Sequence, residues 1–224
     1  MIVKLAVFDC DGTLIDSQVN ILRAMADSFT RHGLVPPPEH ATRRIVGLSL
    51  LEAVQVLLPE AELALQKSLA QDYKTAFQRL RADRSLDPEP LYPGVADLLD
   101  GLRDDGWLLG VATGKSDRGL ALALAHHGLT GHFVTLQTAD RHPSKPHPAM
   151  LHAALSEAGA ATPSAVIIGD TVFDIAMGGN AGVRAIGVDW GYHEAAELID
   201  AGAIGVALDT HQLRRLIDGQ NEQG

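Results

Sequence analysis

The fold of this chain is decided by the stretch VKLAVFDCDGT at residues 3–13. Its nearly continuous apolar run leads directly into two carboxylates, which is typical of a strand buried on both faces of a parallel sheet. Side chains alternate along a strand, so Asp9 and Asp11 leave its carboxyl end on the same side. At roughly 4 Å, two such charges repel each other by about 4 kcal/mol at an effective dielectric constant near 20. We therefore expect a cation, such as a divalent metal ion, at the sheet edge where open α/β folds bind ligands.

The pattern after this strand divides the chain into a helical block and an alternating part. Residues from about 16 to 87 show apolar spacing typical of helices and no strand signal, and the linker DPEP at residues 87–90 closes the block. From Tyr92 onward, short apolar runs alternate with helical stretches, which implies parallel strands joined by crossover helices. The predicted fold is a doubly wound parallel α/β core formed by residues 1–15 and 88–224, with a small all-helical insert at residues 16–87.

The same periodicities predict individual elements. A helix after residue 17 should bury an apolar stripe made of Val19, Leu22, Ala26 and Phe29. Ser49 and Glu52 resemble a capping box that opens a helix to about residue 58. Other helices are expected at about residues 39–46, 60–82, 94–106, 116–127, 171–179 and 194–201, with one from about residue 148 and one near the end. The expected strands are residues 108–112, 133–136, 165–168, 184–188 and 204–207.

Composition restricts the partners and the compartment. The 224 residues include 18 basic and 28 acidic side chains, a formal charge of −10, which argues against a nucleic acid or an anionic membrane as partner. No apolar run is long enough to span a bilayer. The single cysteine, Cys10, excludes an intrachain disulfide, fits a reducing cytosol and is expected to be a small buried residue. We expect a cytoplasmic monomer or homodimer whose residues 220–224 form a frayed tail.

Polar residues also follow the later predicted strands. Thr113 can donate its hydroxyl to a phosphoryl oxygen, and Gly114 lets a ligand approach its backbone amide. Lys145 precedes a proline and supplies a fixed cation. Asp170 lies at a strand end, and Asp174 lies one helical turn beyond it. With the first two acids they would form an all-oxygen site suited to Mg²⁺.

These segments carry a family resemblance. The segment DCDGTLIDS at residues 9–17 resembles the first motif of the haloacid dehalogenase-like superfamily, in its phosphatase branch, and the later segments resemble the other three motifs in the same order. The resemblance implies a Rossmann-like core with a helical cap that closes over the site. It implies that Asp9 is a nucleophile that forms a phosphoaspartate and that Asp11 is the general acid and base. The implied phosphate-binding residues are Thr113, Gly114 and Lys145. The implied Mg²⁺ ligands are Asp9, Asp11 through its backbone carbonyl, Asp170 and Asp174.

The resemblance extends to a subfamily. The segments LYPGV at residues 91–95 and WGY at residues 190–192 look most like those of phosphoglycolate phosphatases. The expected substrate is a small phosphorylated metabolite, with 2-phosphoglycolate first and pyrophosphate, a sugar phosphate and a nucleoside monophosphate still open. The cap cations that can recognise a second anionic group are Arg43, Arg44 and Lys74.

Several alternatives depend on single positions. The β-phosphoglucomutases share the core motifs but carry a basic residue where this chain has Leu50, which weakens a mutase without excluding it. Dehalogenases lack an acid at the position of Asp11. A nucleotide P-loop would need glycine where the chain has Leu109.

Two further alternatives concern the whole chain and its histidines. A receiver domain that holds a phosphoaspartate, or a binding protein, is the non-enzyme alternative, but receivers are about half this length and lack the helical insert. The spacing of His142, His147 and His152 does not place them on one helical face, so we expect surface histidines rather than a metal site.

Overall fold

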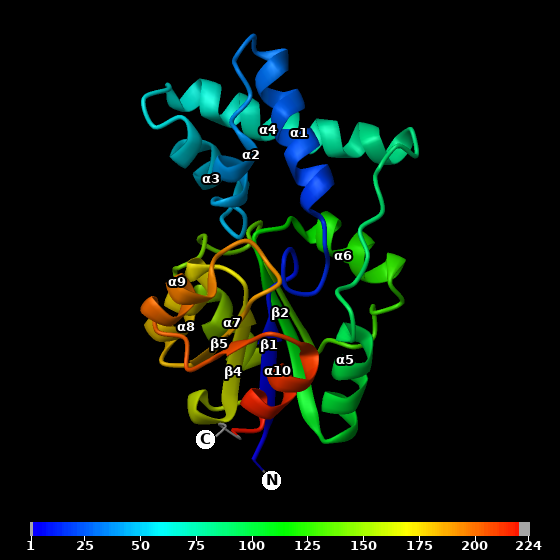
Figure 1. Cartoon of the computed structure of the whole chain (residues 1–224), viewed down its shortest axis with the longest axis vertical. Coiled ribbons are helices and arrows are strands. Elements are labelled where there is room, and N and C mark those ends of the chain that lie inside the picture. Colours follow the sequence, from blue (N-terminus) through cyan, green and yellow to red (C-terminus); the bar gives the residue numbers. More distant parts are fainter. Residues whose placement is uncertain (1, 220–224) are drawn as a thin grey trace.

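A six-stranded parallel sheet forms the centre of the computed structural model, which describes residues 2–219 (Figure 1). Its strands are β1 (Lys4–Phe8), β2 (Trp107–Thr113), β3 (Thr135–Thr138), β4 (Ala165–Gly169), β5 (Arg184–Val188) and β6 (Val206–Ala207). The spatial order is β3-β2-β1-β4-β5-β6, with every neighbouring pair parallel. This is the order of a doubly wound fold, so the predicted fold class is confirmed. The tail predicted at residues 220–224 lies outside the described residues.

Helices cover both faces of the sheet. One face packs against α5 (Val95–Asp104), α6 (Asp117–His126) and α10 (Thr210–Ile217). The other packs against α7 (Ala149–Ala158), α8 (Val172–Ala181) and α9 (Ala195–Asp200), and a 3₁₀ turn, Thr162–Ser164, precedes β4.

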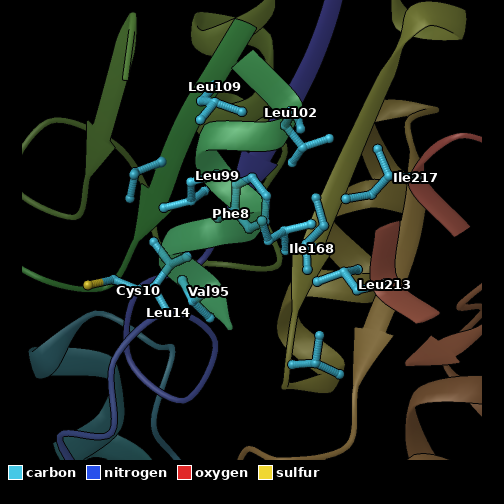
Figure 2. Close-up of a cluster of buried hydrophobic side chains, with 14 of the residues drawn as sticks. Phe8, Cys10, Leu14, Val95, Leu99, Leu102, Leu109, Ile168, Leu213 and Ile217 are labelled. Atoms are coloured by element: carbon cyan, nitrogen blue, oxygen red, sulfur yellow. The ribbon is translucent and has the colours of Figure 1, made fainter. Parts of the chain in front are cut away.

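The central strand β1 is buried on both faces, as its apolar run predicts. Because side chains alternate along a strand, Phe8 joins the cluster under α5 and α10, and Val7 joins the cluster under α7 and α8. Figure 2 shows Phe8 among Leu99, Leu102 and Ile168. This packing fixes the strand whose carboxyl end carries the first two acids.

Four helices form a separate layer beyond the carboxyl end of β1 (Figure 1). They are α1 (Gln18–Arg31), α2 (Glu39–Arg43), α3 (Leu50–Leu57) and α4 (Leu63–Ala82). Residues 16–87 contain no strand. The layer has its own apolar cluster, whose buried members are Met25, Phe29, Ile45, Ala53, Val54, Leu69 and Ala70.

The two chain segments that join this layer to the sheet lie side by side. The amide of Asp16 donates to the carbonyl of Pro90 at 2.9 Å. Asn20 of α1, which is 1% exposed, donates to the carbonyl of Asp87 at 2.9 Å and accepts from its amide at 3.0 Å. These bonds fix the position of the returning segment against the start of α1.

The buried face predicted for α1 is correct at Phe29 and wrong at the other three residues. Val19 is 48% exposed, and Leu22 and Ala26 are only partly buried. The face that is buried also contains polar residues, and its members are Asn20, Ile21, Ala24, Met25, Ser28 and Phe29. An apolar stripe does not reveal this face, because the side chains of Asn20 and Ser28 are buried through hydrogen bonds to backbone groups.

Strand β3 is predicted at residues 133–136 and lies at Thr135–Thr138, a shift of two residues. One further local prediction is wrong. Ser49 is the N-cap residue of α3, but its side chain makes no capping bond. Its backbone amide donates instead to the hydroxyl of Ser144 in the core at 2.7 Å.

The remaining elements agree with the predicted positions to within three residues. None of the helices within residues 2–219 combines the length and the apolar character that a membrane crossing requires.

Candidate active site

The loops that carry Asp9 and Asp170 meet at the point where the strand order of the sheet reverses. Asp9 directly follows β1, and its amide extends the ladder to β4 by donating to the carbonyl of Ile168 at 2.9 Å. Asp170 directly follows β4. Strands β2 and β3 lie on one side of β1, and β4 to β6 lie on the other. Ligands of doubly wound folds bind in this crevice.

Three buried carboxylates and one ammonium form the centre of the site. Ligand atoms of Asp9, Asp170 and Asp174 all lie within 4.8 Å of one another, and each residue is at most 1% exposed. The Nζ atom of Lys145 lies 2.8 Å from Oδ1 of Asp9 and 2.6 Å from Oδ1 of Asp174. The predicted residues are therefore brought together. If the three acids are ionised, one ammonium leaves two negative charges uncompensated.

The pKa values reflect this imbalance. Burial raises the pKa of Asp9 to about 7, against the opposing charge of Lys145. Burial and the charge of Asp9 raise the pKa of Asp170 well above its usual value. For Lys145, burial alone would lower the pKa, but the charges of Asp174 and Asp9 raise it. The cluster is thus unfavourably negative without a further cation.

The carboxylate of Asp9 also has an oxygen without a partner. Oδ2 is buried and has no hydrogen-bond donor among the described residues. An unpaired buried charged oxygen is costly. A small divalent cation would satisfy it and offset the excess negative charge, so the residues present fit Mg²⁺, which prefers oxygen ligands.

The other two carboxylates are held by neighbouring donors. Asp170 accepts from the hydroxyl of Thr13 at 2.7 Å and from the amide of Tyr192 at 3.0 Å. Asp174 accepts from both the amide and the hydroxyl of Thr171, in the capping box that begins α8. Gly12 has a φ of +85°, and a Cβ there would lie 2.2 Å from Oδ2 of Asp170, so only glycine fits this turn.

Asp11 lies apart from this cluster. It is not among the three acids that could share a metal ion through their side chains. Its Oδ1 lies 2.7 Å from Nζ of Lys115 and accepts from the hydroxyl of Ser17. Burial opposes the charge of Lys115, but the ion pair with Asp11 outweighs it and raises the pKa of Lys115. The sequence pattern did not indicate this role for Lys115, because the lysine stands out there only as part of a possible P-loop.

The predicted phosphate-binding residues of the second motif also lie here. Thr113 is buried, and its hydroxyl accepts from the amide of Lys115 at 3.2 Å. Gly114 lies against the helical layer, since a Cβ there would be 2.4 Å from the carbonyl oxygen of Leu48. Glycine is therefore required at this position for the approach of a loop of the helical layer, in addition to the approach of a ligand that the sequence predicted.

The loop before α3 makes several contacts with the core. Besides the bond between Ser49 and Ser144, Nη1 of Arg44 donates to both carboxylate oxygens of Glu197 in α9, at 2.7 and 2.6 Å. The helical layer therefore contacts loops at the edge of the sheet.

A cavity of about 470 Å³ lies between the helical layer and the sheet. Asp9, Asp11 and Thr113 line its inner end. Of the three predicted cap cations, Lys74 lines the cavity, whereas Arg43 and Arg44 do not. The cavity is also lined by two arginines that the sequence pattern did not indicate, Arg81 of α4 and Arg118 of α6. Only contacts between distant segments place them there.

The remaining sequence predictions concern cysteine and histidine. Cys10 is fully buried in the cluster of Figure 2, and burial raises the pKa of its thiol well above the usual value. His142 contacts the side-chain oxygen of Gln137 at 2.7 Å, and His147 and His152 are exposed. Within residues 2–219, no histidine belongs to a group that could hold a metal ion.

Comparison with known families identifies this arrangement. The model of the family described as "Haloacid dehalogenase-like hydrolase" matches residues 6–188. This range includes the four loops that carry the predicted site residues, from Asp9 to Asp174. The chain belongs to this family. The hydrolase is thus an enzyme of the family that its sequence motifs resemble.

Individual relatives agree with this assignment. The hydrolase is 33% identical to "Probable phosphatase IndB" of Dickeya dadantii, over 87% of this chain and 84% of that protein. It is 28% identical to "Phosphoglycolate phosphatase" of Nitrosococcus oceani, over 96% of both chains. A solved structure described as a predicted phosphatase from Clostridium acetobutylicum shares the fold, with a TM-score of 0.87, 23% identity and coverage of 98% of this chain and all of that one.

Proposed function

We propose that this hydrolase is a Mg²⁺-dependent phosphomonoester phosphatase that acts through a phosphoaspartate on Asp9. The observation that carries this proposal is the Asp9 carboxylate, which is buried at the inner end of the cavity, is contacted by Lys145 through one oxygen and has no donor at the other among the described residues. A carboxylate that is fixed but incompletely paired is suited to act as a nucleophile.

In the first step an oxygen of Asp9 attacks phosphorus, and the bond between phosphorus and the ester oxygen breaks. Asp11, held by Lys115 and Ser17, donates a proton to the departing alkoxide. In the second step Asp11 accepts a proton from water, which attacks the phosphoaspartate and releases inorganic phosphate. Lys145 offsets the negative charge of the phosphoryl oxygens, and Thr113 and Gly114 offer further donors.

The residues that would hold Mg²⁺ are Asp9 and Asp170, with the backbone carbonyl of Asp11. When bound, the ion would neutralise charge on the phosphoryl group and on the acids. Asp174 is better suited to hold Lys145, because its Oδ2 already accepts two bonds from Thr171 and its Oδ1 contacts the lysine.

We also propose that residues 16–87 act as a cap domain on a core formed by residues 1–15 and 88–224. The separate apolar cluster of α1 to α4 and the paired linkers at Asp16 and Pro90 support this division. A cytoplasmic location remains our expectation from the single cysteine, and a monomer or homodimer remains our expectation for the assembly.

The similarity to proteins named phosphoglycolate phosphatase makes 2-phosphoglycolate the first substrate to test. Leu50, the first residue of α3, lines the cavity where a β-phosphoglucomutase would present a basic residue, so the hydrolase is favoured over the mutase.

The test is phosphate release from a panel of esters with Mg²⁺, with EDTA, and by Asp9→Asn. We expect release that needs both the metal and Asp9. A folded protein that releases no phosphate from any ester would refute the proposal and favour the binding-protein alternative. Full activity of Asp9→Asn would refute the role of Asp9 as the nucleophile.

A further inference from the structure

The half of the cavity formed by the helical layer has an apolar wall next to the polar side chains of Lys74, Gln78 and Arg81 in α4. Ile21 and Met25 of α1 and Tyr73 and Phe77 of α4 form this wall, together with Leu51 of α3. Tyr73 and Phe77 lie four residues apart on one face of α4, with ring centroids 5.3 Å apart. These side chains face Asp9 and Asp11 across one continuous space.

This wall is poorly matched to a very small, fully charged substrate. The cavity volume, about 470 Å³, lies in the range of about 300–1,000 Å³ that is typical of sites for drug-sized ligands. A two-carbon acid such as 2-phosphoglycolate has almost no apolar surface to place against two aromatic rings and three other apolar side chains. Bound phosphoglycolate would therefore leave the apolar wall in contact with water.

Resting on the proposed phosphatase function, we infer that the preferred substrate is a phosphomonoester whose alcohol part carries an apolar group about as large as a ring. This group packs against Tyr73, Phe77 and Met25 while the phosphoryl group lies at Asp9. Burial raises the pKa of the Tyr73 phenol, so this ring stays uncharged. The preferred substrates are therefore aromatic or branched alkyl phosphate esters rather than phosphorylated two-carbon acids.

Packing of the substrate's apolar group against this wall predicts that kcat/KM depends on the size of that group. Burying one methylene group stabilises a complex enough to raise kcat/KM by about fourfold. Linear alkyl phosphates from ethyl to hexyl release alcohols of similar basicity, so the chemical step is nearly constant along the series. We expect kcat/KM to rise with each added carbon, by up to about fourfold, until the group fills the apolar wall.

The experiment measures kcat/KM for this series with Mg²⁺, in the wild type and in Phe77→Ala. The variant should reduce the increase per carbon, because it removes one of the two rings. Tyr73→Ala is a second variant with the same expectation, in case the first does not fold. Val56→Ala, which removes a 60% exposed apolar side chain of α3 that does not line the cavity, is the matched control and should keep the wild-type increase.

Acetyl phosphate separates failure of this inference from failure of the proposed function. If the wild type hydrolyses acetyl phosphate and Asp9→Asn does not, but kcat/KM is flat along the alkyl series, the inference is overturned and the phosphatase stands. The inference is likewise overturned if Phe77→Ala and Tyr73→Ala keep the full increase. If no phosphate is released from acetyl phosphate or any ester, the proposed function itself fails, and the inference fails with it.

Discussion

Replacing Asp9 by asparagine should abolish turnover and, in EDTA at pH 8, should make the folded protein more stable. The reason is the local charge balance. Asp9, Asp170 and Asp174 are buried together with the single ammonium of Lys145, and Oδ2 of Asp9 lacks a donor among the described residues. Removing one of these charges without changing the side-chain volume should relieve the folded state of an unfavourable interaction.

The magnitude follows from the pKa of Asp9. A folded-state pKa of about 7 against an ordinary value of 3.8 corresponds to a cost on the order of 4 kcal/mol once pH exceeds 7. Because the folded protein holds this proton more tightly than the unfolded chain, the unfolding free energy should fall as pH rises from about 4 to about 7. Lys145 loses one acceptor in the variant, which offsets part of this relief. We therefore expect the unfolding free energy of Asp9→Asn to exceed that of the wild type by about 1–3 kcal/mol at pH 8 and by less at pH 5.

The assay is urea unfolding in EDTA at both pH values, with Asp200→Asn as the control. Asp200 is an exposed acid at the end of α9, so its replacement should change stability by less than about 0.5 kcal/mol. Mg²⁺ should stabilise the wild type and stabilise Asp9→Asn less, because the ion binds the folded state through this carboxylate. If Asp9→Asn is less stable than the wild type at pH 8, or if its gain does not grow between pH 5 and pH 8, the reasoning is wrong.

Three further experiments test other contacts. In EDTA, Lys145→Met should lower the free energy of unfolding by about 3–5 kcal/mol, because it leaves buried carboxylates without their cation. Urea unfolding measures this loss, and a loss below about 1 kcal/mol would show that these acids are not ionised. Gly114→Ala should lower kcat/KM by roughly 100-fold and lower the unfolding free energy by about 1–3 kcal/mol, because its methyl group would lie 2.4 Å from the backbone carbonyl oxygen of Leu48. Unchanged kinetics would mean that this contact has no role in turnover. A double-mutant cycle of Arg44→Ala and Glu197→Ala should give a coupling free energy of unfolding of only about 0.2–1 kcal/mol, because both side chains are partly exposed. A coupling free energy above about 2 kcal/mol would contradict this expectation.

The sheet and the four motif loops could be predicted from the sequence because each is a local pattern. The apolar run before Asp9 determines a buried strand, and parallel strands bring their carboxyl ends to one edge. Thus Asp9 and Asp170 are expected at one edge of the sheet once the alternation is recognised, and the place of Lys145 beside them was implied by the family resemblance.

The features that sequence could not predict depend on contacts between distant residues. Asn20 is buried in α1 because it bonds Asp87, 67 positions away, so an apolar stripe cannot identify that face. The amide of Ser49 donates to the hydroxyl of Ser144, between the helical layer and the loops of the sheet, in place of the capping box that its local pattern suggests. Arg118 of α6 lines the cavity together with residues of the helical layer that are distant in the sequence.

The most direct test of the central claim is to trap the covalent intermediate on Asp9. The wild type would be mixed with acetyl phosphate and Mg²⁺, quenched in acid during turnover, digested and analysed by mass spectrometry. We predict that one phosphoryl group is found on the peptide that contains Asp9, that EDTA prevents it, and that Asp9→Asn carries none. Phosphate release without this adduct, or an adduct on any other residue, would contradict the proposed mechanism.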